Sequence, residues 1–187
     1  MNVYQSCPTL QNDKFLLRLV ADDDLSDLLK VYSDEKAVPF FNSDNCHGDD
    51  FHYTTTERMQ QALDFWLQAY QNGWFVRFAV VDVAANEVVG TIEEFKRDEN
   101  DFFTDCGLLR LDLRSDYENA AAISSILSLI TLPSFDLFGC SMVATKAVPN
   151  ATERIRALTA FGFTKSAEPL VGHDGTKYYD YYVFSKG

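Results

Sequence analysis

The chain has 187 residues, of which 47% are hydrophobic and 24% are charged. This composition is typical of a globular protein and excludes collagen-like and intrinsically disordered chains. The formal net charge is −12, so the surface repels phosphate backbones and favours cationic partners. Nucleic-acid binding is therefore not expected. The start of the chain lacks a signal-peptide pattern and no long apolar run occurs, so we expect no membrane segment and one cytoplasmic domain spanning residues 1–187.

The four cysteines lie far apart and form no C-x-x-C pair: Cys7, Cys46, Cys106 and Cys140. Their spacing fits neither a zinc ribbon nor a compact disulfide framework, so reduced thiols are expected. Cys46, His47 and His52 form the one cluster with metal-ligating side chains, but a polar loop at residues 42–50 explains their proximity as well. We expect no metal.

The first half of the chain predicts a strand, two helices and a hairpin. Residues 15–20 predict the strand, and the acidic run Asp22-Asp23-Asp24 offers an N-cap for a helix. The apolar positions of this helix follow helical spacing: Leu25, Leu28, Leu29 and Tyr32. The capping box Thr54-x-x-Glu57 starts a second helix that ends at Gly73. Residues 74–81 and 87–95 are rich in β-forming side chains and predict a hairpin.

The second half alternates strands and helices. Residues 108–113 predict a strand, and Ser115-x-x-Glu118 is a second capping box before an apolar helix. Residues 142–148 predict the next strand, and Pro149-Asn150-x-x-Glu153 opens a fourth helix that ends at Gly162. A Tyr-rich hairpin at residues 177–184 completes the chain. This order predicts a mixed α+β layer architecture.

Three local patterns accompany that order. They are Leu17-Arg18-Leu19-Val20 before an acidic helix start, Val88-Val89-Gly90-Thr91-Ile92-Glu93, and a closing segment that ends in Phe161-Gly162-Phe163. With these patterns the chain resembles the GNAT superfamily of acyl-CoA-dependent N-acyltransferases, especially the branch similar to ribosomal-protein N-terminal acetyltransferases. The resemblance spans nearly the whole chain. It implies a strongly twisted mixed sheet flanked by helices, in which the strands at residues 108–113 and 142–148 diverge to open a cleft.

The resemblance implies acetyl-CoA as cosubstrate. In the family, a Q/R-x-x-G-x-G/A loop at a helix N-terminus cradles the pyrophosphate with backbone amides. The positions that correspond to the family's cofactor contacts are Leu111, Leu113, Glu118, Asn119, Ala120, Ala121, Ala122, Ile123 and Asn150. Ala121 and Ile123 fill the glycine positions, and Glu118 stands where Gln or Arg is usual. The acidic side chain is expected to weaken CoA binding, while the backbone amides remain and Arg114 or Lys146 offers compensating charge.

The resemblance also suggests the groups that move protons. Family members often use a strand glutamate as base, and the candidates here are Glu93 and Glu94. Adjacent strand residues point to opposite faces, so at most one of them faces the cleft and the other is a structural sheet residue. Leu158 stands where many relatives carry a general-acid Tyr. A thiolate needs little protonation on leaving, so this difference does not exclude catalysis.

Two functions compete at this point. The first is an N-acetyltransferase that transfers acetyl from acetyl-CoA to a primary amine of a small molecule or a protein N-terminus. The second is a non-catalytic binding or regulatory module with a degenerate pyrophosphate loop. Four aromatic residues flank the loop between the first two helices and either line an acceptor pocket or pack beneath the loop: Phe40, Phe41, Phe51 and Tyr53. A homodimer is compatible with either function.

Overall fold

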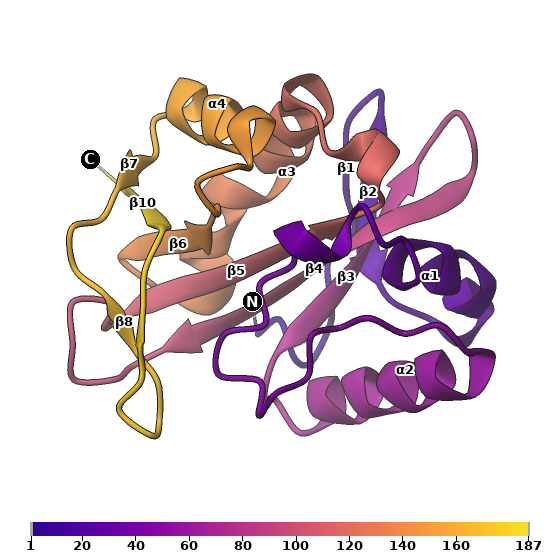
Figure 1. Ribbon diagram of the computed structural model, residues 1–187, viewed down its shortest axis with the longest axis horizontal. Coiled ribbons are helices and arrows are strands. Elements are labelled where there is room, and N and C mark those ends of the chain that lie inside the picture. Colours follow the sequence, from indigo (N-terminus) through magenta and orange to yellow (C-terminus); the bar gives the residue numbers. More distant parts are fainter. Residues whose placement is uncertain (1, 187) are drawn as a thin grey trace.

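The computed structural model describes residues 2–186, and at its centre lies one sheet of eight strands (Figure 1). In chain order the strands are β1 (Leu10–Gln11), β2 (Phe15–Leu19), β3 (Val76–Asp82), β4 (Glu87–Arg97), β5 (Cys106–Leu113), β6 (Met142–Lys146), β7 (Thr164–Lys165) and β10 (Tyr181–Ser185). Their spatial order is β1-β2-β3-β4-β5-β6-β10-β7. All neighbouring pairs are antiparallel except β5 and β6, which are parallel. The mixed α+β class predicted from the sequence is confirmed.

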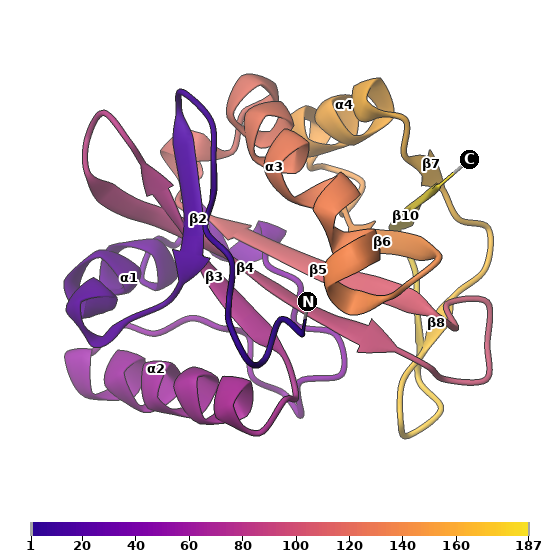
Figure 2. The ribbon, with the colours of Figure 1, turned by 180° about the vertical axis from the view of Figure 1, so that it is seen from behind.

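Helices cover both faces of this sheet (Figures 1 and 2). On one face lie α1 (Leu25–Tyr32) and α2 (Thr56–Gln71), and on the other lie α3 (Ala120–Phe138) and α4 (Thr152–Phe161). Each face has its own buried apolar cluster, one around Leu28, Met59 and Trp66 and the other around Ile126 and Ile130. By length and composition alone α3 is apolar enough to cross a membrane. Most of its apolar side chains belong to the second cluster, so packing on the sheet accounts for its composition.

Three predicted helix starts are wrong. Helix α4 begins at Thr152 with Ala151 as its N-cap, not at Pro149-Asn150. At the other two starts, neighbouring polar residues compete for the cap position. Helix α2 is capped by Thr55 rather than Thr54, and its hydroxyl accepts the amide three residues on at 3.2 Å. Ser115 opens a short 3-10 turn instead of α3. The cap of α3 is Asn119, whose Oδ1 accepts the Ala122 amide at 3.0 Å. Glu118 is therefore not part of a capping box.

The acidic run before α1 also acts differently from the prediction. Asp22–Asp24 form a 3-10 turn, and the Asp24 side chain does not cap α1. Its carboxylate accepts the Ala21 amide at 2.8 Å and both terminal nitrogens of Arg18 at 2.7 and 2.8 Å. The buried aspartate thus ties the end of β2 to the start of α1.

Strands β5 and β6 separate after a short paired stretch. Cys106 to Leu109 pair with Met142 to Thr145, and from Arg110 onward β5 has no partner in β6. On its other edge β5 stays paired with β4 as far as Leu113. The predicted divergence of these two strands is confirmed, and it leaves a gap between the end of β5 and β6.

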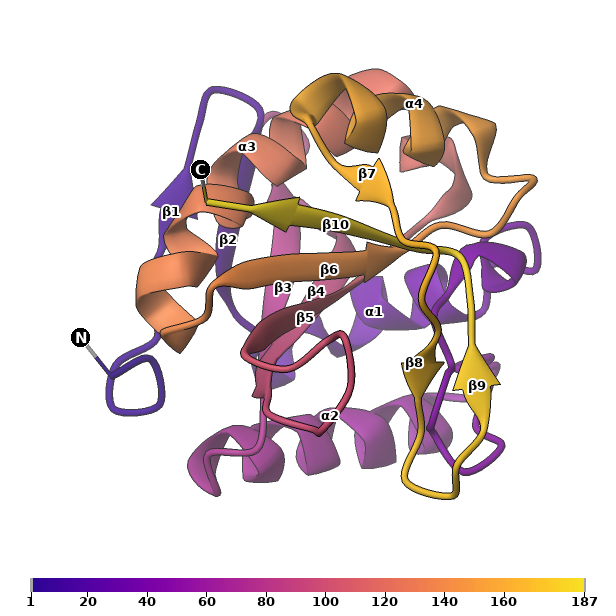
Figure 3. The ribbon, with the colours of Figure 1, turned by 90° about the vertical axis from the view of Figure 1, so that its left-hand side faces the viewer.

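The Tyr-rich C-terminal segment does not form the predicted hairpin. Strand β9 (Lys177–Tyr178) pairs with β8 (Leu170–Val171) in a separate small sheet, whereas β10 pairs with β6 and β7. Asp180, with a φ of 67°, lies between β9 and β10. The β8–β9 hairpin projects from the sheet beside the loop of residues 41–50 (Figure 3). There the His173 amide donates to Asn45 Oδ1 at 3.3 Å.

Candidate functional site

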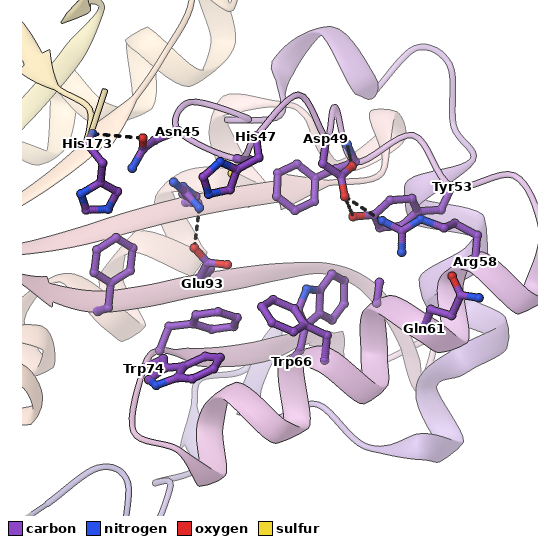
Figure 4. Close-up of a pocket in the computed structure, with 17 residues that line it drawn as sticks. Asn45, His47, Asp49, Tyr53, Arg58, Gln61, Trp66, Trp74, Glu93 and His173 are labelled. Atoms are coloured by element: carbon purple, nitrogen blue, oxygen red, sulfur yellow. Dashed lines mark hydrogen bonds and ion pairs between the residues drawn. The ribbon is translucent and has the colours of Figure 1, made fainter. Parts of the chain in front are cut away.

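A pocket of about 410 Å³ opens between helix α2, strands β4 and β5, and the loop of residues 41–53 (Figure 4). Its walls combine seven aromatic rings with charged and polar groups. Of the four aromatic residues predicted to lie near this loop, Phe51 and Tyr53 line the pocket. Phe41 packs in the cluster under α1 and α2 instead. The pocket is therefore lined largely by aromatic side chains and lies against the sheet.

A row of three charged side chains crosses the sheet at the pocket, and two of them, Glu93 and Arg110, line its floor. Arg77 on β3, Glu93 on β4 and Arg110 on β5 stand directly opposite one another in the sheet. One Glu93 oxygen pairs with Arg77 and the other accepts from Arg110 Nη1 at 2.7 Å. Burial alone would raise the pKa of Glu93, but the two arginines outweigh it and hold that pKa below its ordinary value. Glu93 is therefore a carboxylate with both oxygens engaged.

Arg77 also makes contacts with other buried side chains. Its Nη1 donates to Tyr32 Oη at 3.0 Å and to Thr91 Oγ1 at 3.1 Å. The Tyr32 hydroxyl in turn donates to Asp112 at 2.9 Å. The guanidinium carbon of Arg77 lies 4.1 Å from the Trp66 ring centroid, a cation–π contact. Every member of this network is buried, so Arg77 is held by several side chains beneath the pocket.

Glu94, the other predicted base, lies on the opposite face of the sheet. It is fully buried, and neither of its oxygens has a hydrogen-bond partner within residues 2–186. The nearby Ser134 hydroxyl donates to the Ile130 carbonyl. Burial raises the pKa of Glu94 from 4.5 to about 8. At neutral pH this side chain is an uncharged acid under α3, and it does not line the pocket.

The loop that roofs the pocket has an unusual backbone. Asn45, His47 and Phe51 have φ values of 60°, 54° and 61°, which is rare for a bulky residue such as Phe. Asp49 fixes the loop, since its carboxylate accepts the Phe51 amide at 2.8 Å and Arg58 Nη2 at 2.7 Å. Such strained segments concentrate where a protein binds or reacts with a ligand. The Asp49 contacts hold this loop in that conformation over the pocket.

The gap between β5 and β6 contains a side chain from α4. Arg154, with 2% of its side chain exposed, donates to the Leu111 carbonyl at 2.7 Å and to the Phe40 carbonyl at 3.3 Å. It also donates to both oxygens of Glu118 at 2.8 and 2.7 Å. The Glu118 side chain is itself only 7% exposed. A buried, two-point ion pair therefore fills the gap.

The N-terminus of α3 also has partners within the chain. Glu153 of α4 accepts the Ala120 amide at 3.0 Å, and Asn119 accepts that of Ala122. Most of the remaining residues that were predicted to contact the cofactor are buried: Leu111, Leu113, Ala122 and Ile123. The other two, Ala121 and Asn150, are exposed. Asn150 and Glu118 line a small depression of about 200 Å³ outside the gap.

No family model and no curated protein matches the chain. Solved structures resemble it over most of its length. RimL, a ribosomal alpha-N-protein acetyltransferase in complex with coenzyme A, is 15% identical, with 95% of this chain and 98% of that chain covered at a TM-score of 0.69. The microcin self-immunity acetyltransferase MccE, in complex with acetyl-CoA and AMP, is 11% identical, with 94% of both chains covered at 0.69. A GNAT-family acetyltransferase from Bacillus anthracis is 15% identical, with 95% and 98% covered at 0.66. The chain has the GNAT acetyltransferase fold.

Side chains of the chain itself already make contacts at the gap of this GNAT fold. Arg154 lies where the two strands part and holds the Leu111 carbonyl, while Glu153 takes an amide at the start of α3. The basic residues that the sequence offered in compensation are also engaged. Arg114 pairs with Asp116 at 2.7 Å, and Lys146 pairs with Asp44 at 2.6 Å. A donor would have to displace these contacts to enter.

Sequence reasoning missed the arginines that organise the site. Arg77 lies inside the apolar run of β3, Arg110 shares β5 with one other charge, Asp112, and Arg154 shares the buried face of α4 with Ala157 and Leu158. A charge in a buried strand was the available signal, because buried charges are almost always paired. The partners were not readable, since pairing across a sheet joins residues far apart in the chain.

The cluster considered for metal binding does not form a metal centre. Cys46 and His47 line the pocket, and His52 is not among its lining residues. Across residues 2–186 no group of three or more His, Cys, Asp or Glu side chains is placed to hold a metal ion. The four cysteines are free thiols in the structure.

Proposed function

We propose that the protein is an N-acyltransferase that acetylates a primary amine bound in the aromatic pocket. The observation that carries this proposal is the position of Arg110. It is the first residue of β5 without a partner in β6, and its side chain also lines the pocket. The pocket therefore adjoins the point where the strands part. An acceptor in the pocket and a donor in the opened gap would meet there.

The charged residues at the floor of the pocket determine which side chain is able to accept the ammonium proton. Of the two candidate glutamates, Glu93 is the one that lines the pocket, so the proposal that a strand glutamate accepts the ammonium proton rests on it. Both of its oxygens already hold arginines, which lowers its basicity. We infer that Glu93 acts mainly by positioning Arg110, and that the proton passes to water in the pocket.

The acceptor belongs to one of two classes, a small-molecule amine or a protein N-terminus. Support for a protein acceptor comes from the similarity to RimL, a ribosomal alpha-N-protein acetyltransferase. Support for acetyl-CoA as donor comes from the same structure, solved with coenzyme A, and from MccE, solved with acetyl-CoA. At 11–15% identity these similarities concern the fold.

A second function is favoured by one specific observation, the buried Arg154–Glu118 pair in the gap. A chain that had lost donor binding would be free to fill the gap with its own side chains. The protein would then be a binding module that retains the aromatic pocket and transfers no acyl group.

Calorimetric titration with acetyl-CoA, followed by an amine panel assayed for release of the free CoA thiol, separates the two functions. The acyltransferase proposal expects saturable acetyl-CoA binding and thiol release that depends on the amine. Absence of binding at millimolar acetyl-CoA, by a protein that melts cooperatively, would reject it in favour of the binding module.

A further inference from the structure

The aromatic pocket has the features of a site that selects its ligand by a flat ring. We propose that its ligand is a primary amine carried on a planar aromatic group, rather than an aliphatic polyamine. The claim that the ligand carries a primary amine rests on the proposed function. The claim that it carries a planar aromatic group rests on the pocket alone.

The open walls of the pocket are aromatic. Phe65 and Trp74 are 49% and 58% exposed, although large apolar side chains are usually buried. Their ring centroids lie 6.4 Å apart, and the Phe75 centroid lies 6.0 Å from that of Phe65. Phe95 extends the aromatic wall along β4. These rings offer exposed faces and edges to an aromatic ligand, which is the arrangement that aromatic pairs favour.

The carboxylates of the pocket are already neutralised. Glu93 holds an arginine on each oxygen. Asp49 accepts from Arg58 at 2.7 Å and from the Tyr53 hydroxyl at 2.9 Å through one oxygen, and from a backbone amide through the other. The pocket therefore presents no unpaired carboxylate for the several ammonium groups of a polyamine. The acidic surface implied by the net charge of −12 does not extend into this cavity.

The volume of the pocket and the positions of its aromatic and charged residues indicate how the ligand is oriented. A cavity of about 410 Å³ lies within the range of small-molecule sites, roughly 300–1,000 Å³. Phe65 belongs to α2 and its ring lies near that of Trp74, while Glu93 pairs with Arg110, the first residue of β5 beyond its pairing with β6. A ring against the tryptophan side directs the amine toward the gap between the strands.

The chain provides its own reporter for this binding. It contains two tryptophans, and both Trp66 and Trp74 line the pocket. Tryptophan fluorescence of the full chain is titrated with phenylethylamine, with cyclohexylethylamine and with spermidine, in the absence of any acyl donor. The first two amines share charge and chain length and differ in the ring, which is flat and aromatic in the first and puckered and saturated in the second. Phenylethylamine is expected to bind about tenfold more tightly than cyclohexylethylamine, the size expected of one or two ring contacts, and spermidine to bind more weakly than either.

A pair of variants locates the effect. Trp74→Leu keeps apolar bulk and removes the ring, so the preference for phenylethylamine should fall to within about twofold, with Trp66 as the remaining reporter. Phe102→Leu is the matched control, because Phe102 is 48% exposed and lies outside the pocket. Its preference should equal that of the unmodified protein.

The inference is overturned if cyclohexylethylamine binds as tightly as phenylethylamine, if spermidine binds more tightly, or if none of the three amines changes the fluorescence. The same amines are then offered with acetyl-CoA. Ring-selective binding without any transfer overturns the proposed acyltransferase function alone. Transfer to spermidine but not to phenylethylamine overturns the ring inference alone.

Discussion

Glu94 allows a test of the structure that is independent of any ligand. Its carboxyl group lies in the apolar layer between β4 and α3, with both oxygens unpartnered within the described residues 2–186. A charged carboxylate there is unfavourable, and burial raises the pKa of Glu94 from 4.5 to about 8. The variant Glu94→Gln has the same shape as the protonated acid and does not titrate. It therefore isolates the free energy of unfolding that is linked to this one proton.

The sign and size of the effect follow from linkage. The folded protein holds the Glu94 proton more tightly than the unfolded chain does. The resulting stability is fully present below pH 4.5 and is lost as the pH rises through about 8. The whole shift corresponds to about 5 kcal/mol, of which about 3 kcal/mol is lost between pH 5 and pH 8. The variant is expected to keep this part of the stability.

The assay is urea unfolding of both proteins at pH 5, 7 and 8, which yields the free energy of unfolding at each pH. The difference between Glu94→Gln and the unmodified protein should grow with pH in favour of the variant. Glu168→Gln, at an exposed glutamate, is the matched control and should follow the unmodified protein. If the curves for Glu94→Gln and the unmodified protein run parallel from pH 5 to pH 8, Glu94 is not a buried neutral acid and the reasoning fails.

Three further substitutions test the site and the sheet. Glu93→Gln removes the counter-charge of two buried arginines and should cost about 3–5 kcal/mol in urea unfolding; full stability would show that the arginine row is not a coupled unit. Gly90→Ala places a Cβ at 2.3 Å from the Asp112 carbonyl oxygen, so its melting temperature should fall sharply; an unchanged value would contradict the β4–β5 register. Arg154→Met leaves Glu118 buried without its partner and should cost about 3–5 kcal/mol. The double variant Glu118→Gln/Arg154→Met should recover most of that loss in a double-mutant cycle, and additive losses would refute the pairing.

Much of the fold was predictable because its signals are local. The apolar spacing of α2 and α3 and the β-rich strands β3 to β5 are readable within windows of a few residues. The errors arose where several residues satisfy the same local rule. Thr54, Thr55 and Thr56 are all able to cap a helix, and packing rather than propensity selects Thr55. The Tyr-rich C-terminus predicts a hairpin because its two strands are adjacent in sequence, whereas β9 pairs with the preceding strand β8 and β10 pairs with β6 and β7.

The candidate site was less predictable, because its chemistry depends on pairing over long sequence distances. Glu93 was found from its place on a strand, but its two arginines lie 16 and 17 residues away on neighbouring strands. Those partners turn a candidate base into the centre of an ion-pair row. Trp74 and Phe65 carried no signal beyond apolarity, since only the fold reveals that these rings stay exposed on one wall.

Glu118 shows how the structure changes an electrostatic argument from sequence. Read alone, an acid at the start of α3 repels a phosphate group through its charge. In the structure Glu118 is paired with Arg154, 36 residues away, so the net charge at this point is compensated. The obstacle to a donor is then occupancy rather than repulsion, because the pair and the carbonyl of Leu111 form one buried unit. The effect of a buried ion pair that fills the gap depends only weakly on salt, whereas repulsion between exposed charges is screened by salt. The difference in acetyl-CoA affinity between Glu118→Gln and the unmodified protein, measured at several ionic strengths, therefore separates the two causes. The difference should stay constant for a filled gap and shrink at high salt for an exposed acid.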